Sequence, residues 1–532
     1  MIRWVAFLLC LSGVSFSQLD RRYQPDDWIL FTQPGRITSI SEGLSYIYFA
    51  SALGGIQRYQ YYAGEFDFPI TVAQGLPENA VEAVHFDKNT GILWVVTRKY
   101  ICYSYDRIGD WYYQSKEDYG FPANTPVIQL GHDSQSLWVV TPTMIYQLDH
   151  NGGVLLGVMP SMDPLNIVWS SSPLRTGEPL PEFLLDFAIN DGWTVFPDRF
   201  LDHYGRDIVP TAIFQQEFGE IWIGTAEGFI LKVDIQSETI FPLRVGLANN
   251  DVNLIVRDKA MWLAGNVGRW SRGITRFSWK RNFTDWYEYD VTINLSPVNY
   301  YTGLAWGNEI WFVGNSVLEI YNKKNDFWRM ISPMTFGRAY TIKADSATIW
   351  IGLSTGAMRL NPKTKRIIAP DILDRLEQRP VYDIEFIRGN VWFATDEGIY
   401  VYNPINETLQ PGDAFESEMR CLMFPTWQIG VNNDSVYVAN NHGLWLWAGN
   451  QCELIISLTS FHNRPVTTFA IVDHHLFIGT TDGFYRMNKD GSGYYSYNYP
   501  FVKPVNDMYI SDEECWLATN HGLVRFNWRS DP

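Results

Sequence analysis

One short phrase returns about every forty residues along the whole chain, and it limits the possible folds more than any other feature. It consists of an aromatic residue followed by apolar or small residues, as in Trp222-Ile223-Gly224-Thr225. A period near forty residues with several short strands per unit is typical of β-propeller blades. The eleven visible copies begin at Tyr48, Trp94, Trp138, Trp222, Trp262, Trp311, Trp350, Trp392, Tyr437, Phe477 and Trp516.

Each unit is predicted to contain a β-hairpin rather than a helix. The anchor phrase forms one strand, a short turn follows, and residues such as 229–234 form the next strand. The anchor strands are apolar on successive residues, which indicates that stacked sheets bury both faces. A glycine recurs in the turn, where a hairpin needs a positive φ. These glycines are Gly55, Gly228, Gly356, Gly398, Gly443, Gly483 and Gly522.

The spacing predicts about twelve blades. Trp138 and Trp222 lie 84 residues apart, twice the usual interval, so we expect a disguised unit in the Pro-rich stretch 151–204. Propellers close with about four to eight blades, so the simplest arrangement is two rings of six. The predicted fold is therefore all-β, with tandem β-propellers of four-stranded blades.

The last unit ends without an outermost strand, so an earlier segment must complete its sheet. Asp27 to Phe31 and Asp285 to Tyr289 both resemble outer strands that could close a ring, because an open ring would expose sheet edges. We accordingly expect a first propeller over residues 18–290 and a second over residues 291–532.

The N-terminus has the features of a secretory signal peptide. Arg3 is followed by the apolar stretch Val5 to Val14 and by small residues at Ser15 and Ser17, which predicts cleavage of residues 1–17. We expect an exported protein, periplasmic, cell-surface or secreted, with no stable membrane insertion because no later stretch approaches the roughly eighteen apolar residues of a spanning helix. The net charge of −17 argues against nucleic acid as a partner.

The repeats resemble those of the two-component regulator propeller family of bacterial periplasmic sensors. The matching motifs are Gly75-Leu76-Pro77-Glu78-Asn79-Ala80-Val81, Gly246-Leu247 through Val252, and Trp222-Ile223-Gly224-Thr225 through Gly228. This resemblance covers nearly all the mature chain and implies a propeller of the cell envelope. Double propellers are also similar to a surface-associated component of the type IX secretion machinery.

Motifs for catalysis are not evident. Gly352-Leu353-Ser354-Thr355-Gly356 matches the nucleophile pattern Gly-x-Ser-x-Gly, but it lies in the register of the hairpin turns, whereas that pattern needs a strand followed by a helix. We expect no enzyme activity, cofactor or metal. Cys421 and Cys452 are predicted to lie on the inner and outer strands of one blade, roughly 14 Å apart, so a disulfide between them is not expected.

Polar hairpin tips form one candidate partner surface and an enlarged hairpin forms another. The tips carry Asp396, Glu397, His442, Asp482 and His521, a set that suits a cation, a sugar or a basic peptide group, although polar residues beside glycine also simply make good turns. The enlarged hairpin carries Arg269, Trp270 and Arg272. An exposed Trp between two Arg residues suits a sugar ring or a carboxylated peptide, although a Trp that folds back onto the propeller surface is the simpler alternative.

These features predict a non-enzymatic binding or scaffold protein that recognises a protein or glycan partner in the bacterial cell envelope. Two alternatives remain open. One is a ligand-sensing module of a two-component system. The other is a propeller enzyme of the lyase or glycosidase type, which requires carboxylates converging on one cleft at about 5 to 10 Å.

Overall fold

The fold is described from a computed structural model. It describes residues 24–530 except 108, 161–165, 217–218, 279, 281–282, 332–336, 369–375, 377, 412–419, 449–450 and 512, so the predicted signal peptide lies outside the described residues. Within that range the chain forms 50 β-strands and several short 3-10 helices, and no α-helix. The all-β prediction is therefore confirmed. None of the helices in the described range is long and apolar enough to cross a membrane.

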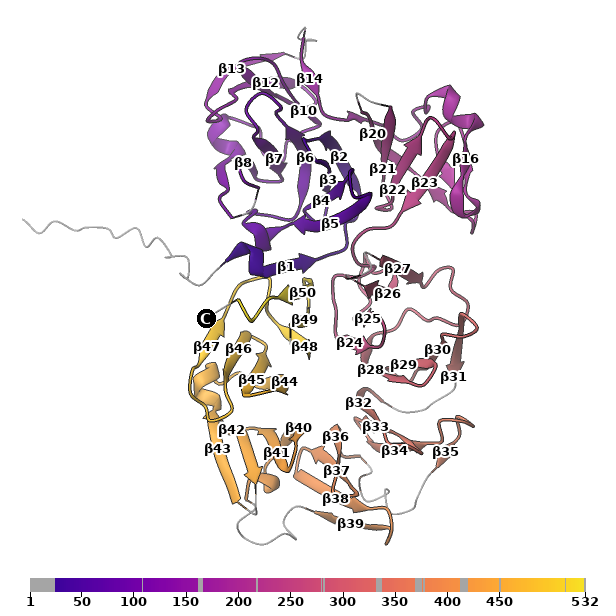
Figure 1. Cartoon of the computed structure of the whole chain (residues 1–532), viewed down its shortest axis with the longest axis vertical. Coiled ribbons are helices and arrows are strands. Elements are labelled where there is room, and N and C mark those ends of the chain that lie inside the picture. The colour runs from indigo at the N-terminus through magenta and orange to yellow at the C-terminus, as the bar shows by residue number, and fades with distance from the viewer. Residues whose placement is uncertain are drawn as a thin grey trace, which may run out of the picture.

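Every anchor phrase lies on the second strand of an antiparallel sheet, and we name each blade by its anchor residue. Seven of these sheets form a ring in the lower half of Figure 1. The Trp262, Trp311, Trp350 and Trp392 blades are β24 (Leu254–Arg257), β25 (Met261–Ala264), β26 (Gly273–Ser278) and β27 (Phe283–Glu288); β28 (Tyr300–Trp306), β29 (Glu309–Gly314), β30 (Leu318–Asn322) and β31 (Phe327–Ile331); β32 (Ala339–Ala344), β33 (Ile349–Leu353), β34 (Gly356–Leu360) and β35 (Ile367–Ile368); and β36 (Val381–Ile387), β37 (Asn390–Thr395), β38 (Gly398–Asn403) and β39 (Thr408–Pro411).

The ring continues through three more blades near the C-terminus. The Tyr437, Phe477 and Trp516 blades are β40 (Thr426–Asn432), β41 (Ser435–Asn440), β42 (Gly443–Ala448) and β43 (Gln451–Ser457); β44 (Val466–Val472), β45 (His475–Thr480), β46 (Gly483–Asn488) and β47 (Tyr495–Tyr497); and β48 (Val505–Ile510), β49 (Cys515–Thr519), β50 (Gly522–Phe526) and β1 (Trp28–Phe31).

The seven-bladed ring is closed in two ways. Its innermost strands contact one another in sequence from β24 to β48, and β48 also contacts β24. The N-terminal strand β1 pairs antiparallel with β50 and supplies the fourth strand of the last sheet, as its sequence predicts. A hydrophobic cluster containing Phe31, Leu263 and Trp516 fills the space between the last blade and the first. The ring is therefore closed by pairing between strands β1 and β50, which lie almost 500 residues apart in the sequence.

The other four blades form a smaller unit in the upper half of Figure 1, with inner strands in the order β20, β2, β6 and β10. The segment Val168–Pro173 fills the remaining side, because β14 pairs with β10 and β15 pairs with β20. The Tyr48, Trp94, Trp138 and Trp222 blades are β2 (Ile37–Glu42), β3 (Tyr46–Ser51), β4 (Ile56–Gln60) and β5 (Glu65–Ile70); β6 (Val81–Phe86), β7 (Leu93–Thr97), β8 (Tyr100–Ser104) and β9 (Tyr112–Ser115); β10 (Gln129–His132), β11 (Ser136–Val140), β12 (Met144–Asp149) and β13 (Leu155–Pro160); and β20 (Pro210–Gln215), β21 (Glu220–Thr225), β22 (Ile230–Asp234) and β23 (Thr239–Leu243).

The stretch in which a disguised blade was expected forms no four-stranded sheet in its described part. Its pieces instead extend neighbouring sheets or form one small three-stranded sheet. They are β14 (Val168–Trp169), β15 (Ser172–Pro173), β16 (Ala188–Ile189), β17 (Thr194–Val195), β18 (Phe200–Leu201) and β19 (Asp207–Ile208). The 3-10 helices are η1 (Pro25–Asp27), η2 (Val72–Gln74), η3 (Lys116–Tyr119), η4 (Glu182–Asp186), η5 (Asn190–Gly192), η9 (Arg420–Met423) and η10 (Leu458–Phe461).

The blades are thus divided as four and seven, not as six and six with a boundary at residue 290. Of the two expected closing strands, only the one at Trp28–Phe31 closes a ring. The segment at Asp285 is the ordinary fourth strand β27 of the Trp262 blade, whose inner strand already contacts β48. The expected propellers over 18–290 and 291–532 are therefore not the units into which the sheets assemble.

The anchors form the core between blades. The indoles of Trp94, Trp222, Trp262, Trp311 and Trp516 are fully buried, as the two-sided apolar pattern predicts. The seven turn glycines all have positive φ, from 70° at Gly55 to 157° at Gly483. A side chain at Gly443 would place Cβ 2.0 Å from the carbonyl oxygen of Ile456, so that turn admits only glycine.

The prediction that Cys421 and Cys452 do not pair is wrong. Their Cα atoms are 6.0 Å apart and they form a disulfide. Cys421 lies on η9 rather than on an inner strand, and it packs in the hydrophobic cluster between the Trp392 and Tyr437 blades, beside Cys452 on β43. This position removes the three strand spacings on which the prediction depended. Cys102 and Cys515 are free and buried.

Candidate functional site

All eight residues predicted for a partner surface lie in turns between second and third strands of the seven-bladed ring. In a four-stranded antiparallel blade these turns are on the same side as the linkers that enter the inner strands. We call this side the tip face. Because the Trp262 blade belongs to this ring, the hairpin with Arg269, Trp270 and Arg272 lies on the same face as Asp396, Glu397, His442, Asp482 and His521. The two predicted surfaces therefore belong to one face.

The acidic tips are held by local partners rather than by one another. Glu397 forms an ion pair with Arg379 of the preceding linker, and Asp482 lies 3.7 Å from the ammonium of Lys503. Asp396 is exposed beside Glu397. The structure therefore brings these carboxylates to one face but not into one cluster.

The two histidines are also separate. The ring of His442 lies 4.2 Å from that of Phe424, centroid to centroid, and its carbonyl oxygen accepts a hydrogen bond from the Leu458 amide. Burial lowers the pKa of His521, an effect that the nearby carboxylate of Asp251 opposes. Both histidines are exposed in their turns, on different blades of the ring.

The enlarged hairpin presents Trp270 to solvent. The Trp270 side chain is 61% exposed, and the Arg269 guanidinium lies 4.9 Å from the centroid of its indole. The main-chain carbonyl oxygen of Trp270 accepts a hydrogen bond from the side-chain amide of Gln33. Arg272 differs, because its guanidinium lies over the buried indole of Trp286 at 5.7 Å. Burial lowers the pKa of Arg272, and neighbouring carboxylates oppose that shift. Arg269 and Trp270 are available to a partner, whereas Arg272 is turned inward.

An aromatic arc lines half of the channel mouth on the tip face, and the sequence analysis missed it. Tyr301, Tyr340, Tyr382 and Trp427 each occupy the extra residue of a β-bulge at the start of an inner strand. Ring centroids are 5.0 Å apart for Tyr340 and Tyr382 and 5.9 Å for Tyr382 and Trp427. The guanidinium of Arg338 lies 4.0 Å from the Tyr301 ring and 5.3 Å from the Tyr340 ring.

Arg338 is exposed, and it forms no ion pair with a described residue. The planar guanidinium lies against both tyrosine rings and carries five N–H donors. The signal for the arc is visible in the sequence as an aromatic residue at the second position of four consecutive inner strands. This pattern indicates a common site only when the β-bulge at each of these positions is known.

The other half of the mouth is polar. The equivalent bulge positions are Thr467 and Asn506, and Asn253 lies at the corresponding place before β24. The Asn506 amide donates hydrogen bonds to the Asn520 side chain at 2.7 Å and to the Val252 carbonyl at 2.8 Å. A ligand at the mouth would therefore meet aromatic rings on one side and amides on the other.

Buried carboxylates inside the channel join one blade to the next. Asp383 accepts a hydrogen bond from the Ile429 amide at 2.9 Å, and Asp507 accepts one from the Ile255 amide at 2.8 Å. Burial raises the pKa of Asp383, and it raises the pKa of Asp507 to about 6. These contacts give both residues a structural role at blade junctions.

A lysine lies among these carboxylates. Burial alone would lower the pKa of Lys343, but attraction from Asp383 and Glu385 exceeds that effect and the pKa is raised. The Lys343 ammonium pairs with Glu385 at 3.0 Å. The acidic groups that an enzyme would need at a channel are present, but these contacts already engage them.

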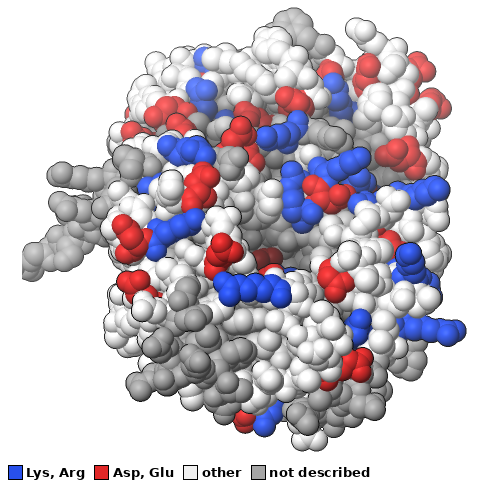
Figure 2. Space-filling model, turned by 60° about the horizontal axis from the view of Figure 1, so that its bottom comes forward, with Lys and Arg blue, Asp and Glu red and all other residues white. Residues whose placement is uncertain are grey.

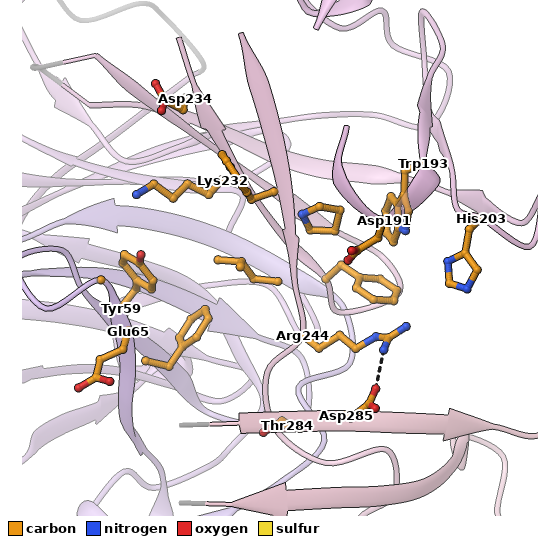
Figure 3. Close-up of a pocket in the computed structure, with 16 residues that line it drawn as sticks. Tyr59, Glu65, Asp191, Trp193, His203, Lys232, Asp234, Arg244, Thr284 and Asp285 are labelled. Carbon is orange, nitrogen blue, oxygen red and sulfur yellow. Dashed lines mark hydrogen bonds and ion pairs between the residues drawn. The ribbon is translucent and has the colours of Figure 1, made fainter. Parts of the chain in front are cut away.

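A pocket of about 1070 Å³ lies between the smaller unit and the seven-bladed ring (Figure 3). Its walls come from the Tyr48 and Trp222 blades, the stretch around η5, and the outer strand β27. Figure 3 places Tyr59 and Glu65 on one side and Asp191, Trp193 and His203 on the other. No sequence pattern indicates this pocket, because its residues come from segments up to about 230 positions apart.

Charges of both signs are interspersed over the face in Figure 2, around a central hollow. A mixed surface of this kind orients a partner through individual pairs more than through one broad field.

The fold is shared with solved structures. PorZ, a surface component of the type-IX secretion system of Porphyromonas gingivalis, is similar with a TM-score of 0.57 and 11% identity, over 94% of this chain and 87% of that chain. Extracellular domains of B. thetaiotaomicron are also similar: BT4673, a putative one component system (TM-score 0.41, 14% identity, 92% of this chain and 70% of that chain), and BT3049, a putative hybrid two component system (0.42, 17%, 91% and 73%).

At these identities the similarity concerns the fold alone. No protein-family model and no curated protein matches the sequence. The link to the regulator propeller family therefore stays a resemblance of the repeats.

Proposed function

We propose that this chain is an exported, non-enzymatic β-propeller protein that recognises a protein or glycan partner in the bacterial cell envelope through the tip face of its seven-bladed ring. The aromatic arc with Arg338 is the observation that carries this proposal. Four neighbouring blades repeat an aromatic side chain at a bulge, a device that directs side chains at functional edges.

The chemistry of the mouth suits recognition. Tyr, Trp and Arg are the residues most often found at binding hot spots, and the half-buried rings lose little entropy when a partner docks. Trp270 on the same face adds a second exposed aromatic group. The predicted signal peptide and the resemblance of the repeats support the envelope as the location.

The test compares partner capture by the native chain with capture by a variant carrying Tyr382→Ala and Trp427→Ala. Envelope proteins and an array of envelope glycans are probed in parallel, and bound material is quantified. We expect the double variant to lose the partner that the native chain binds. Tyr113→Ala, which removes a 56% exposed tyrosine from an outer strand of the smaller unit, is the matched control and should retain it. Equal capture by all three proteins would show that the mouth is not the recognition surface.

A further inference from the structure

Two exposed guanidinium groups on the tip face carry charge that no described carboxylate neutralises. Arg269 and Arg338 are both exposed, and neither forms an ion pair or a side-chain hydrogen bond with a residue in the described ranges. By contrast, Arg379 of the same face pairs with Glu397. A carboxylate of a ligand would therefore meet Arg269 and Arg338 without displacing a described partner.

An aromatic ring positions each of these two guanidinium groups. Arg269 lies 4.9 Å from the centroid of the Trp270 indole, and Arg338 lies 4.0 Å from the centroid of the Tyr301 ring. The backbone of Arg338 is also held, because its carbonyl oxygen accepts a hydrogen bond from the Ser354 amide at 2.8 Å. Since the guanidinium is a rigid fork of donors, little conformational entropy is lost for each hydrogen bond that it forms with a carboxylate.

Hydrogen bonds connect the enlarged hairpin to the aromatic arc. The Val267 amide in this hairpin donates to the side-chain oxygen of Asn299 at 2.8 Å, and the side-chain amide of Asn299 donates to the Tyr301 hydroxyl at 3.4 Å. The two arginines therefore belong to one surface that crosses neighbouring blades, a shape that suits an extended ligand. We call this surface the tip strip, and its members are Arg269, Trp270, Tyr301, Arg338, Tyr340, Tyr382 and Trp427.

The packing of the rings in the strip favours a peptide over a sugar. The Tyr340 and Tyr382 rings meet at an interplanar angle of 61°, and the Tyr382 and Trp427 rings meet at 83°. In such edge-to-face contacts the edge of one ring lies against the face of the next, so the rings form ridges rather than the flat platform on which a sugar ring stacks. Ridges of aromatic side chains accept proline rings, as in the grooves that bind extended proline-rich peptides.

We propose that the tip strip binds an extended acidic peptide segment of a partner protein. Carboxylates of this segment pair with Arg269 and Arg338, and its proline or aliphatic side chains lie against the aromatic arc. Bonds between an ionised carboxylate and a guanidinium are about twice as strong as neutral hydrogen bonds, so these two pairs select an acidic segment. The inference rests on the proposed function, which leaves open whether the partner is a protein or a glycan.

One carboxylate of the chain opposes such a ligand. Burial and the neighbouring Tyr340 raise the pKa of Tyr382, and the exposed carboxylate of Asp396 adds to this shift, so its negative charge lies close to the arc. The overall charge of −17 also repels an acidic peptide at long range. Affinity therefore depends on contact with the two arginines, and removing the charge of Asp396 should strengthen binding.

The test measures fluorescence anisotropy with the full chain and a set of labelled decapeptides, acetylated and amidated, in which two Glu residues are separated by two, four or six Pro or Leu residues. The site variant carries Arg269→Gln and Arg338→Gln. The control variant carries Arg329→Gln and Arg388→Gln, which removes the same charge from exposed positions on β31 and in the turn between β36 and β37, both outside the tip face. We expect at least one peptide to bind, about tenfold more weakly to the site variant and with a change below about twofold for the control.

Three further arms sharpen the result. Asp396→Asn should tighten peptide binding about twofold, a gain that a poorly folded variant cannot produce. Arg338→Gln alone should weaken binding, which covers the case in which the double variant folds poorly. The same peptides with Gln in place of Glu should bind at least about tenfold more weakly to the native chain.

Two outcomes would overturn the inference. One is that no peptide of the set binds, or that the site and control variants weaken binding equally. The other is capture of an envelope glycan that is lost in the site variant while no peptide binds, which would identify a glycan surface instead. In both cases the proposed function stands if the variant with Tyr382→Ala and Trp427→Ala still loses its envelope partner, and it is wrong if that variant captures the partner as the native chain does.

Discussion

Replacement of Trp28 by alanine should open the seven-bladed ring at its closure. Trp28 is 1% exposed and lies on β1, opposite Phe526 of β50 in the antiparallel pair. Its indole stacks on the Phe526 ring with centroids 4.0 Å apart, and it meets Tyr499 and Phe501 edge-on. Since β1 supplies the fourth strand of this sheet, loss of its packing weakens the closure of the ring.

The magnitude follows from the burial. Deleting a fully buried Trp side chain costs about 3–5 kcal/mol, which includes the cavity that it leaves. At about 2 °C per kcal/mol for a domain of this size, the unfolding transition of the ring should fall by roughly 6–10 °C. Amide hydrogens of β50 should also exchange faster, because Leu30 and Trp28 pair with Val524 and Phe526 in the register of that sheet.

Differential scanning calorimetry and hydrogen exchange check this prediction. Trp270→Ala is the matched control, since the same side chain is removed from a position that is 61% exposed. Its effect should stay within about 0.5 kcal/mol, or about 1 °C. Similar shifts for both variants, or unchanged exchange in β50, would refute the claim that β1 closes the ring.

The free energy of unfolding should decrease on acidification from pH 7 to 5. Burial lowers the pKa of His85 and of His132, whose ring nitrogens are 2.6 Å apart, so the unfolded state binds more protons than the folded state below about pH 6.5. For His85, whose pKa lies well below its usual value, the loss of stability approaches about 1.4 kcal/mol per pH unit, and urea titrations at several pH values should show a flatter profile for His85→Gln. Gly443→Ala should destabilise the ring by about 2–3 kcal/mol through the close approach to Ile456, whereas Gly389→Ala, at a positive φ but in open space, should cost about 1 kcal/mol in the same denaturant assay.

The repeats predict the blades because the physical signals are local. An anchor phrase that is apolar on both faces must lie between two sheets, and a turn glycine must accept a positive φ. Both signals lie within about ten residues of each other, as at Trp222 and Gly228. The structure buries Trp222 and gives Gly228 a positive φ, as predicted. Local patterning thus identified the eleven anchored sheets.

The division into rings could not be predicted in the same way. The segments at Trp28 and Trp286 both begin with Asp-Trp, and each supplies the fourth strand of a sheet. The Trp28 segment pairs with β50, almost 500 residues further along the chain, whereas the Trp286 segment pairs with β26, the strand just before it. Local sequence contains no information that separates these cases, because the choice depends on which inner strands contact one another.

The candidate site shows the same limit. Residues of the tip turns were placed on one face because the hairpin register is local, but Arg272 turns inward over Trp286, which no spacing indicates. The aromatic arc at Tyr340 and Tyr382 depends on bulges, and the pocket depends on segments that meet only in the folded chain. Sites made by long-range assembly are therefore the part that sequence reasoning misses.

Closure by β1 also determines how the smaller unit is attached. Because β1 precedes that unit in the chain and the Trp262 blade follows it, the smaller unit leaves the ring and returns to it at the same place. The two connections lie side by side, since the Leu247 amide donates a hydrogen bond to the Thr32 carbonyl at 3.0 Å. Two adjacent tethers restrict rotation between the units more than one linker does, so the walls of the pocket at Tyr59 and Asp285 are held at a set separation. The ring closure that stabilises the fold therefore also sets where the smaller unit lies against the ring.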